Sequence, residues 1–222
     1  MSTLPKAQSA DIMMLLEGTY PYVSGGVSSW VHRLIEGFPE YRFACVFLGS
    51  RPEDYGDLRY PLPENVVHVE THYLHDTHEA PAPRILKGDA EAMKQVRRFH
   101  DRLRAVSAGD TPPDGLAETL REALSPDGMD EAQFLHSQAA WDFITENYRA
   151  HCTDPSFVDY FWSVRSMHRP IWQLRRIAEN LIPATLYHTV STGYAGFLGT
   201  LLKQQTGRPL LLSEHGIYTK ER

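Results

Sequence analysis

Short apolar runs and a segment of helical periodicity follow one another along the first third of the chain. Residues 11–17 form an apolar run with a charge at each end, which is typical of a strand buried on both faces of a parallel sheet. Apolar side chains recur at helical spacing over residues 27–35, and further apolar runs occupy residues 42–48 and 66–69. This order of strand, helix, strand and strand predicts a doubly wound α/β domain.

The middle of the chain, from about residue 84 to residue 183, has helical periodicity instead. Residues 134–148 predict one helix and residues 157–181 another, with a break or kink at Pro170, whose ring nitrogen cannot donate a hydrogen bond. We interpret these helices as an insertion within a single Rossmann-like domain that spans residues 1–222.

The α/β pattern returns at the end of the chain. Residues 184–190 predict a strand, residues 194–204 a helix, and residues 209–213 another buried strand. Open α/β sheets bind their ligands outside the carboxyl ends of the strands. The loops that follow the first strand and these last two strands are therefore where we expect the functional residues.

Two glycines, Gly25 and Gly26, stand directly before the first predicted helix. Glycine lets a ligand approach the backbone closely, and the free N–H groups and dipole of a helix N-terminus favour an anion. A plain strand-to-helix turn explains the pair equally well. The segment contains neither the G-x-G-x-x-G dinucleotide fingerprint nor the G-K-[ST] of a P-loop, which argues against a nucleotide-dependent oxidoreductase.

Histidines follow or interrupt several predicted strands. His215 comes directly after a buried strand, where a histidine can bind a sugar hydroxyl or a phosphate, or act as a base. His188 lies inside a strand, where a structural role in the core is equally open. Four more histidines crowd residues 68–78, and there we favour a solvated polar loop over a zinc site because no cysteine joins them.

Composition narrows the functional class. Hydrophobic residues make up 42% of the 222 residues, enough for a folded core, and the net charge is −6, whereas nucleic-acid-binding proteins are usually basic. No apolar run approaches the roughly 20 residues of a membrane span, and the N-terminus has no secretory signal pattern. Two cysteines provide no disulfide framework, and Cys45 lies in an apolar run. We expect a cytoplasmic protein that binds no nucleic acid and does not itself span a membrane.

Three segments together resemble the N-terminal half of the family 4 (GT4) glycosyltransferases of GT-B fold, and more narrowly the cytoplasmic enzymes of bacterial Pel exopolysaccharide synthesis. They are residues 15–31 (LLEGTYPYVSGGVSSWV), 47–51 (FLGSR) and 213–218 (SEHGIY). The resemblance implies the acceptor-side half of a retaining enzyme that transfers a hexose or N-acetylhexosamine from a UDP-sugar to a saccharide acceptor. It implies no metal and no other cofactor, and no D-x-D motif occurs in the sequence.

The same resemblance implies roles for particular positions. Gly25 and Gly26, with Ser24 and Val27 beside them, would face the donor diphosphate, and His215 would be the catalytic residue near the donor sugar. Acceptor and sugar contacts would come from Tyr20, Thr189, Ser191, Thr192, Tyr194 and Glu214. The basic residue that precedes the glycines in relatives of glycogen synthase is absent, so the other half of the enzyme would neutralise most of the diphosphate charge.

A GT-B enzyme also needs a nucleotide-sugar domain, which would follow His215 and is not within these 222 residues. We therefore expect the chain alone to be incomplete and inactive. A second hypothesis is a non-catalytic module that docks on a membrane-bound polysaccharide synthase complex of the inner membrane through its helical insertion. An exposed apolar stripe on residues 157–177 would favour this second hypothesis.

Overall fold

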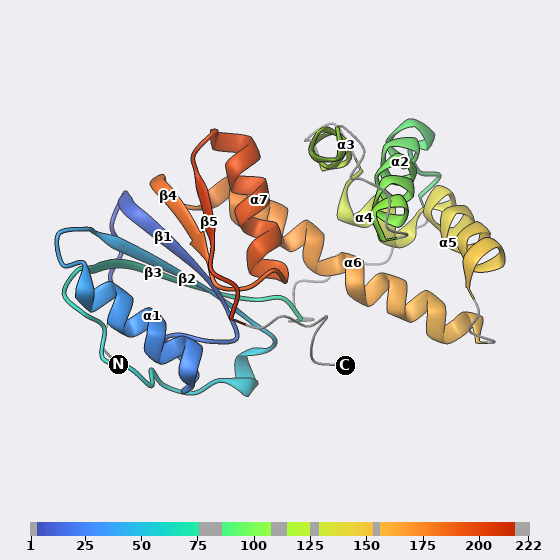
Figure 1. Cartoon of the computed structure of the whole chain (residues 1–222). Helices are drawn as coiled ribbons and strands as arrows, with labels where there is room; N and C mark the ends of the chain where they lie inside the picture. Colours follow the sequence, from blue (N-terminus) through green and yellow to red (C-terminus); the bar gives the residue numbers. More distant parts are fainter. Residues whose placement is uncertain (1–3, 76–85, 108–114, 125–128, 153–155, 216–222) are drawn as a thin grey trace. The chain divides into compact units, whose positions relative to one another are not determined.

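The computed structural model describes residues 4–75, 86–107, 115–124, 129–152 and 156–215 (Figure 1). The chain divides into two compact units. Residues 1–78 and 173–222 form the first, here called the sheet unit, and residues 79–172 form the second, the helical unit. Residues 173–183, at the end of the predicted insertion, belong to the sheet unit.

Five parallel strands form one sheet in the order β3-β2-β1-β4-β5. Their bounds are β1 (Ala10–Glu17), β2 (Phe43–Gly49), β3 (Val66–Tyr73), β4 (Ala184–Thr189) and β5 (Leu210–Leu212). The predicted α/β class with a Rossmann-like parallel sheet is confirmed, and the architecture is consistent with one half of a GT-B fold. A short 3-10 helix, η1 (Pro52–Asp54), follows β2.

Helices cover the central strand β1 on both faces, α1 (Gly26–Gly37) on one and α7 (Tyr194–Thr206) on the other. Met14 and Leu16 share a hydrophobic cluster with the apolar side of α1. Leu15 faces α7 instead, where a Cβ on Gly199 would come within 3.2 Å of it. Residues 13–16 are therefore completely buried, because alternate side chains of a strand point to opposite faces of the sheet.

The two cysteines are free. Cys45 of β2 is completely buried, as predicted from its apolar surroundings. Burial raises the pKa of its thiol to about 12, so the side chain stays protonated and packs as a small apolar group.

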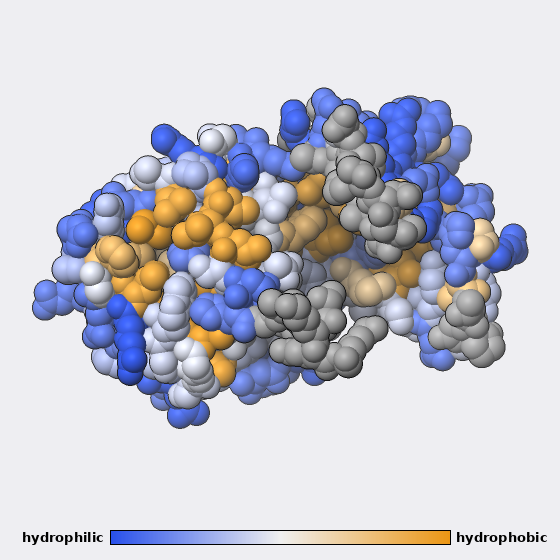
Figure 2. Space-filling view, viewed as in Figure 1, coloured by the Kyte–Doolittle hydropathy of each residue, from blue (hydrophilic) through white to orange (hydrophobic). Residues whose placement is uncertain are grey.

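The two edges of the sheet differ. Residues 5–7 pair antiparallel with β3 through two backbone hydrogen bonds of 3.0 Å, which covers that edge. β5 forms the opposite edge, and its Leu211 and Leu212 are 48% and 46% exposed; Figure 2 shows apolar surface where β5 runs. The prediction that this strand is buried is wrong, because the order of strands in the sheet, which hydropathy does not encode, places it at an edge.

The helical unit has its own hydrophobic core. Its elements are α2 (Ala90–Ser107), α3 (Leu116–Ala123), α4 (Glu131–His136), α5 (Gln138–His151) and the first part of α6 (Phe157–Asn180). Met93, Phe134, Phe143 and Trp172 are among the buried residues of this core. None of the described helices, in either unit, is long and apolar enough to cross a membrane.

Two predictions for these helices are wrong. The single helix predicted over residues 134–148 is divided at Ser137, whose hydroxyl accepts the Ala140 N–H at 3.1 Å and caps α5. Of the break or kink predicted at Pro170, the break does not occur, because α6 runs through this residue. Pro170 is buried and its neighbour Trp172 belongs to the core, so packing outweighs the one backbone hydrogen bond that proline cannot donate.

A pair of histidines lies inside the helical unit. The Nε2 atoms of His100 and His168 are 3.0 Å apart, and His168 Nδ1 lies 2.6 Å from the carbonyl oxygen of Val164. Because a carbonyl only accepts, His168 carries its proton on Nδ1, and its Nε2 accepts from His100. Burial, and second to it the neighbouring His168, lowers the pKa of His100 to about 4, and burial also lowers the pKa of His168.

We expect acidification to destabilise the helical unit. The unfolded chain protonates His100 near pH 6.5 and the folded chain only near pH 4, so stability falls as the pH drops through this window, by about 3 kcal/mol. His100→Gln keeps a donor for His168 but does not titrate, and should flatten this dependence. Thermal melts between pH 7 and pH 4 measure it, with the exposed His151→Gln as control. The same pH dependence in His100→Gln as in the wild type would contradict the assignment.

Candidate functional site

All five strands are parallel, but the side on which successive strands are added to the sheet changes between β1 and β4. β2 and β3 are added on one side of β1, and β4 and β5 on the other. The loops after β1 and β4 therefore start at neighbouring points and diverge, one toward α1 and the other toward α7. Ligands of parallel α/β sheets bind at such a point.

Glu17, the last residue of β1, bridges this point. Its Oε2 accepts the Ser191 hydroxyl at 3.2 Å and the Ala195 backbone N–H at 3.1 Å. Ala195 lies in the first turn of α7, which has no acidic residue of its own. The carboxylate of Glu17, at the end of β1, thus caps α7 and compensates the dipole of this helix. Glu17 is not among the predicted site residues; the available signal was a charge that ends a buried strand.

Two glycines make this arrangement possible. A Cβ on Gly193 would lie 2.5 Å from Oε2 of Glu17, closer than real side chains approach. Gly18 has a φ of +59°, in the left-handed region that costs other residues free energy. Gly18 turns the chain out of β1 directly after Glu17, and Gly193 leads it into α7.

Most of the residues predicted in the loop after β4 lie beside Glu17. Ser191 bonds to it directly, and Thr189 Oγ1 donates to the Ser191 carbonyl at 2.9 Å. Tyr194 begins α7, where burial, with the Glu17 carboxylate second, raises the pKa of its hydroxyl. Thr192 is exposed on the same loop. The loop therefore presents hydroxyl groups around a helix terminus that a carboxylate already occupies.

The N-terminus of α1 is open by comparison. Its cap, Gly25, makes no side-chain hydrogen bond to the first turn, and that turn has no acidic residue. No described atom lies within 4 Å of where a Cβ would stand on Gly25 or Gly26, and neither glycine has a φ in the left-handed region. The described structure thus gives no steric reason for glycine at either position, and a side chain at Gly25 or Gly26 would have room.

Two tyrosines, Tyr60 and Tyr20, support the turn that contains Gly25 and Gly26. The hydroxyl of Tyr60 accepts the Gly25 N–H at 3.4 Å. Tyr20 is completely buried, with its ring 5.4 Å from the ring of Tyr60, so it supports the turn rather than lining its surface. Ser24 is exposed before the glycines, and Val27 is half-buried after them.

His215, three residues beyond β5, lies against α1. Its ring centroid is 4.8 Å from that of Trp30, with an interplanar angle of 70°. His188 of β4 meets the same tryptophan at 6.0 Å and 88°, and its Nε2 is 2.9 Å from Ser213 Oγ. Glu214 is exposed between Ser213 and His215. The loop after β5 is thereby brought to the helix that begins with the glycine pair.

The structure places His188 in the core, the structural role that its sequence position left open. It is a core residue, only 4% exposed, and it also contacts Trp30 and Ser213 at the edge of the site. Burial, and second to it the neighbouring His215, lowers its pKa. At neutral pH the His188 ring is therefore uncharged, which lets it pack against an indole without an unpaired buried charge.

The histidine-rich segment forms a different cluster. Glu70 Oε1 is 2.7 Å from His68 Nε2, and Glu70 Oε2 is 3.0 Å from His72 Nε2. These hydrogen bonds, that of His72 first, lower the pKa of Glu70 to about 2. The strand predicted over residues 66–69 extends to Tyr73, so the prediction of a loop is wrong for residues 70–73. No group of the described residues is arranged to hold a metal ion. His78 of the predicted cluster lies outside the described residues.

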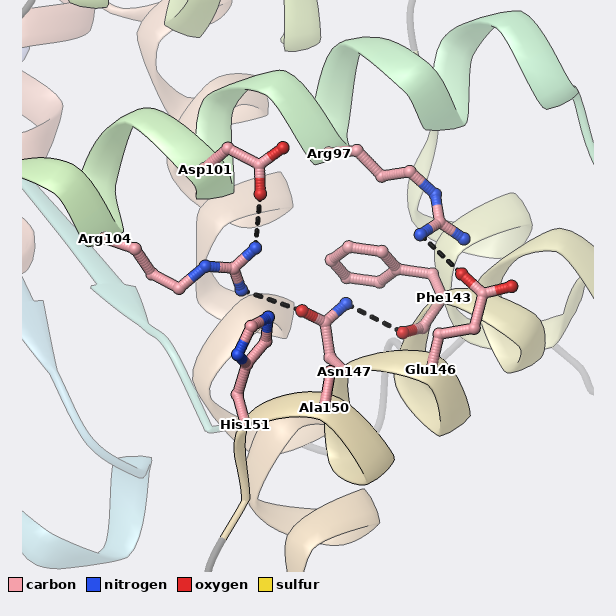
Figure 3. Close-up of a pocket in the computed structure, with 8 residues that line it drawn as sticks. All are labelled: Arg97, Asp101, Arg104, Phe143, Glu146, Asn147, Ala150 and His151. Atoms are coloured by element: carbon pink, nitrogen blue, oxygen red, sulfur yellow. Dashed lines mark hydrogen bonds and ion pairs between the residues drawn. The ribbon is translucent and has the colours of Figure 1, made fainter.

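A separate pocket of about 270 Å³ lies between α2 and α5 in the helical unit (Figure 3). Arg97 pairs with Glu146 at 2.6 Å. Arg104 pairs with Asp101 and donates to Asn147 Oδ1 at 2.7 Å. Both guanidinium charges are therefore compensated inside the pocket, and Arg97 and Arg104 join α2 to α5.

The chain matches the family described as "Domain of unknown function (DUF3492)" over residues 10–222. The match includes β1, the loop with the glycine pair and every other residue of the candidate site. No curated protein and no solved structure matches the chain.

Replacing Glu17 by alanine removes two hydrogen bonds and a charge at the N-terminus of α7, and we expect a local destabilisation of about 1 kcal/mol. The Ala195 amide reports on this directly because it donates to Glu17, and its hydrogen exchange should become roughly fivefold faster. Glu179→Ala, which removes an exposed pair with Arg175, is the control and should leave this rate unchanged. Equal protection of Ala195 in Glu17→Ala and wild type would rule out the capping role.

Proposed function

The chain belongs to the DUF3492 family, which is associated with the N-terminal domains of GT4-like glycosyltransferases, and on this premise we propose that it is the acceptor-side half of a retaining GT-B glycosyltransferase. In such an enzyme a second Rossmann-like half binds the nucleotide-sugar. The substrates are then a UDP-sugar, with a hexose or N-acetylhexosamine, and a saccharide acceptor.

The open glycine turn at the N-terminus of α1 is the observation that carries this proposal. Two helices begin at the carboxyl edge of the sheet beside the point where the side of strand addition changes, and each has a positive dipole end. At α7 the carboxylate of Glu17 fills that end. At α1 the first turn has neither an acidic residue nor a side-chain cap, and no described atom outside the local backbone lies within 4 Å of the Cβ position on either glycine. A diphosphate therefore fits α1 and is repelled from α7.

The chemistry of the transfer requires such a place. When the bond between the anomeric carbon and the donor phosphate oxygen breaks, negative charge builds up on the departing diphosphate. Backbone N–H groups at Gly26 and Val27, which have no acceptor within their own helix, would donate to this charge. Donors that are already oriented stabilise a developing charge without reorganisation, which is an effective form of catalysis.

The other candidate residues then surround the two sugars. His215 would donate from its imidazole to a hydroxyl of the donor sugar and position it against the diphosphate. The hydroxyl groups of Ser191, Thr192 and Tyr194, with the exposed Glu214 carboxylate, would bind the hydroxyl groups of the acceptor. Tyr20 has a different role from the one first expected, since its buried ring supports the phosphate-binding turn.

Within this class we propose the narrower assignment to bacterial Pel exopolysaccharide synthesis, in the cytoplasm. Its support is the resemblance of residues 15–31, 47–51 and 213–218 to those enzymes. The first two segments form the end of β1, the glycine turn, the start of α1 and the end of β2. Residues 216–218 of the third segment lie outside the described residues.

Gly25→Ala separates ligand binding from folding. With a φ of 165° and no described atom near a Cβ, we expect melting to be unchanged, while turnover falls about tenfold because the methyl group stands where the diphosphate approaches. His215→Ala should lower turnover about a hundredfold. The assay is sugar transfer from UDP-sugars by the glycosyltransferase that carries both halves.

His151→Ala, at an exposed histidine of the helical unit, is the matched control for this assay. Unchanged turnover in His215→Ala would remove His215 from the site, and full activity of Gly25→Ala would remove the phosphate from the α1 turn. Calorimetric titration of UDP into residues 1–222 alone tests the half-enzyme, because tight binding of UDP by these residues would contradict it.

An exposed apolar surface on the helical unit favours a second candidate function, docking on a membrane-bound polysaccharide synthase complex. Val158 and Trp162, one turn apart on α6, are 61% and 59% exposed, and Trp141 of α5 is 46% exposed. Arg165 lies over the Phe161 ring at 5.3 Å beside them. Tryptophan and arginine are enriched at the centres of protein interfaces, so this surface suits a protein partner.

Trp162→Ser should weaken capture of the chain by the purified inner-membrane synthase subunits at least tenfold, because it removes the largest exposed anchor. Leu211→Ser, at an exposed apolar residue of the sheet unit, is the control and should bind as the wild type does. Equal capture of Trp162→Ser, or no capture of the wild type, would exclude docking through this surface.

A further inference from the structure

One tryptophan side chain joins two of the candidate loops. Trp30 lies on α1, four residues after Gly26, where the helix begins. Its indole contacts the ring of His215 at 4.8 Å and the ring of His188 at 6.0 Å. Both contacts have the tilted or perpendicular geometry that aromatic rings prefer, at 70° and 88°. The indole is half-buried and packs on the cluster that α1 forms with the sheet.

The position of the His215 ring depends on the contact with Trp30, because His215 lies beyond the end of β5. It follows β5, which ends at Leu212, and it is exposed and outside regular secondary structure. The backbone of β5 is tied to β4 up to Ser213, whose N–H donates to the Thr189 carbonyl at 3.0 Å. Beyond that bond, the ring contact with Trp30 is what relates the His215 imidazole to α1.

The ring of His188 contacts the same tryptophan and supports it from β4. Its ring is buried, and its Nε2 bonds to Ser213 Oγ at 2.9 Å. Trp30 therefore contacts one histidine that is fixed in the core and one that is exposed on a loop. Because the Trp30 indole contacts both rings, it links the fixed position of His188 on β4 to the loop that carries His215.

We propose that Trp30 is a positioning residue, which holds the His215 imidazole at a set distance from the glycine turn of α1. Trp30 has this role only if the chain is the glycosyltransferase half proposed above. Gly26 and His215 then act on the two ends of one donor, the diphosphate and the sugar. Their spacing must be kept, since a displacement of about 1 Å at a reacting group can cost two orders of magnitude in rate.

Histidine NMR on residues 1–222 tests the contact without any turnover. In the wild type the indole ring current displaces the Cε1–H signals of His188 and His215. Trp30→Leu should return both signals toward the values of free histidine, and Trp30→Phe should retain part of the displacement. Trp162→Leu, at an exposed tryptophan of the helical unit, should leave both signals in place. If Trp30→Leu does not fold, Trp30→Met, with a large flexible side chain and no ring, replaces it.

Steady-state kinetics of the enzyme with both halves test the function of the contact. We expect Trp30→Leu to lower kcat about tenfold with little change in KM for the UDP-sugar, and Trp30→Phe to recover most of the loss. A merely structural role would lower the amount of folded enzyme and not the kcat of what remains, which active-site titration distinguishes.

The outcomes separate the two proposals. A His215 signal that does not move in Trp30→Leu, or a kcat that does not fall although the signal moves, overturns the role of Trp30. An absence of sugar transfer in the wild type, with the NMR contact intact, overturns the glycosyltransferase assignment and with it the need to position His215.

Discussion

Burial of the sheet on both faces is the constraint on which the rest of the sheet unit depends. Residues 13–16 of β1 are completely buried between α1 and α7, and a polar ligand has no access to either face. Along this central strand, polar side chains can therefore gather only where the strand ends and the chain turns. Glu17, Ser191 and Ser213 all stand at such ends, after β1, β4 and β5.

The two helices that begin at this edge differ in whether a carboxylate compensates the positive end of the helix dipole. Both helices have a glycine at the N-cap and no acidic residue in the first turn. Glu17 reaches α7 from β1 and accepts a hydrogen bond from one of its first-turn N–H groups, that of Ala195, whereas the first turn of α1 has no side-chain cap. The dipole of α1 is therefore left without a compensating carboxylate in the described structure, and hydroxyl groups lie at the N-terminus of α7.

Several polar and charged groups of the helical unit pair with one another. His100 and His168 bond to each other within the core, and Arg97 and Arg104 are paired across α2 and α5. Buried groups paired in this way need no ligand. Apolar side chains, Trp162 among them, are exposed on its surface. The two units thus present different surfaces, a polar strand edge in one and exposed tryptophans in the other.

The sequence by itself determined the α/β class, most element positions and the loops that carry the site, because continuous apolar runs, helical periodicity and paired glycines are local signals. Only the tertiary structure decided that β5 lies at an edge, that Glu17 caps α7 and that Trp30 meets His215. Glu17 and Ser191 are 174 residues apart, and no local pattern relates them. Such contacts depend on the order of strands in the sheet, which is set by the packing of the whole chain and not by the hydropathy of any one segment.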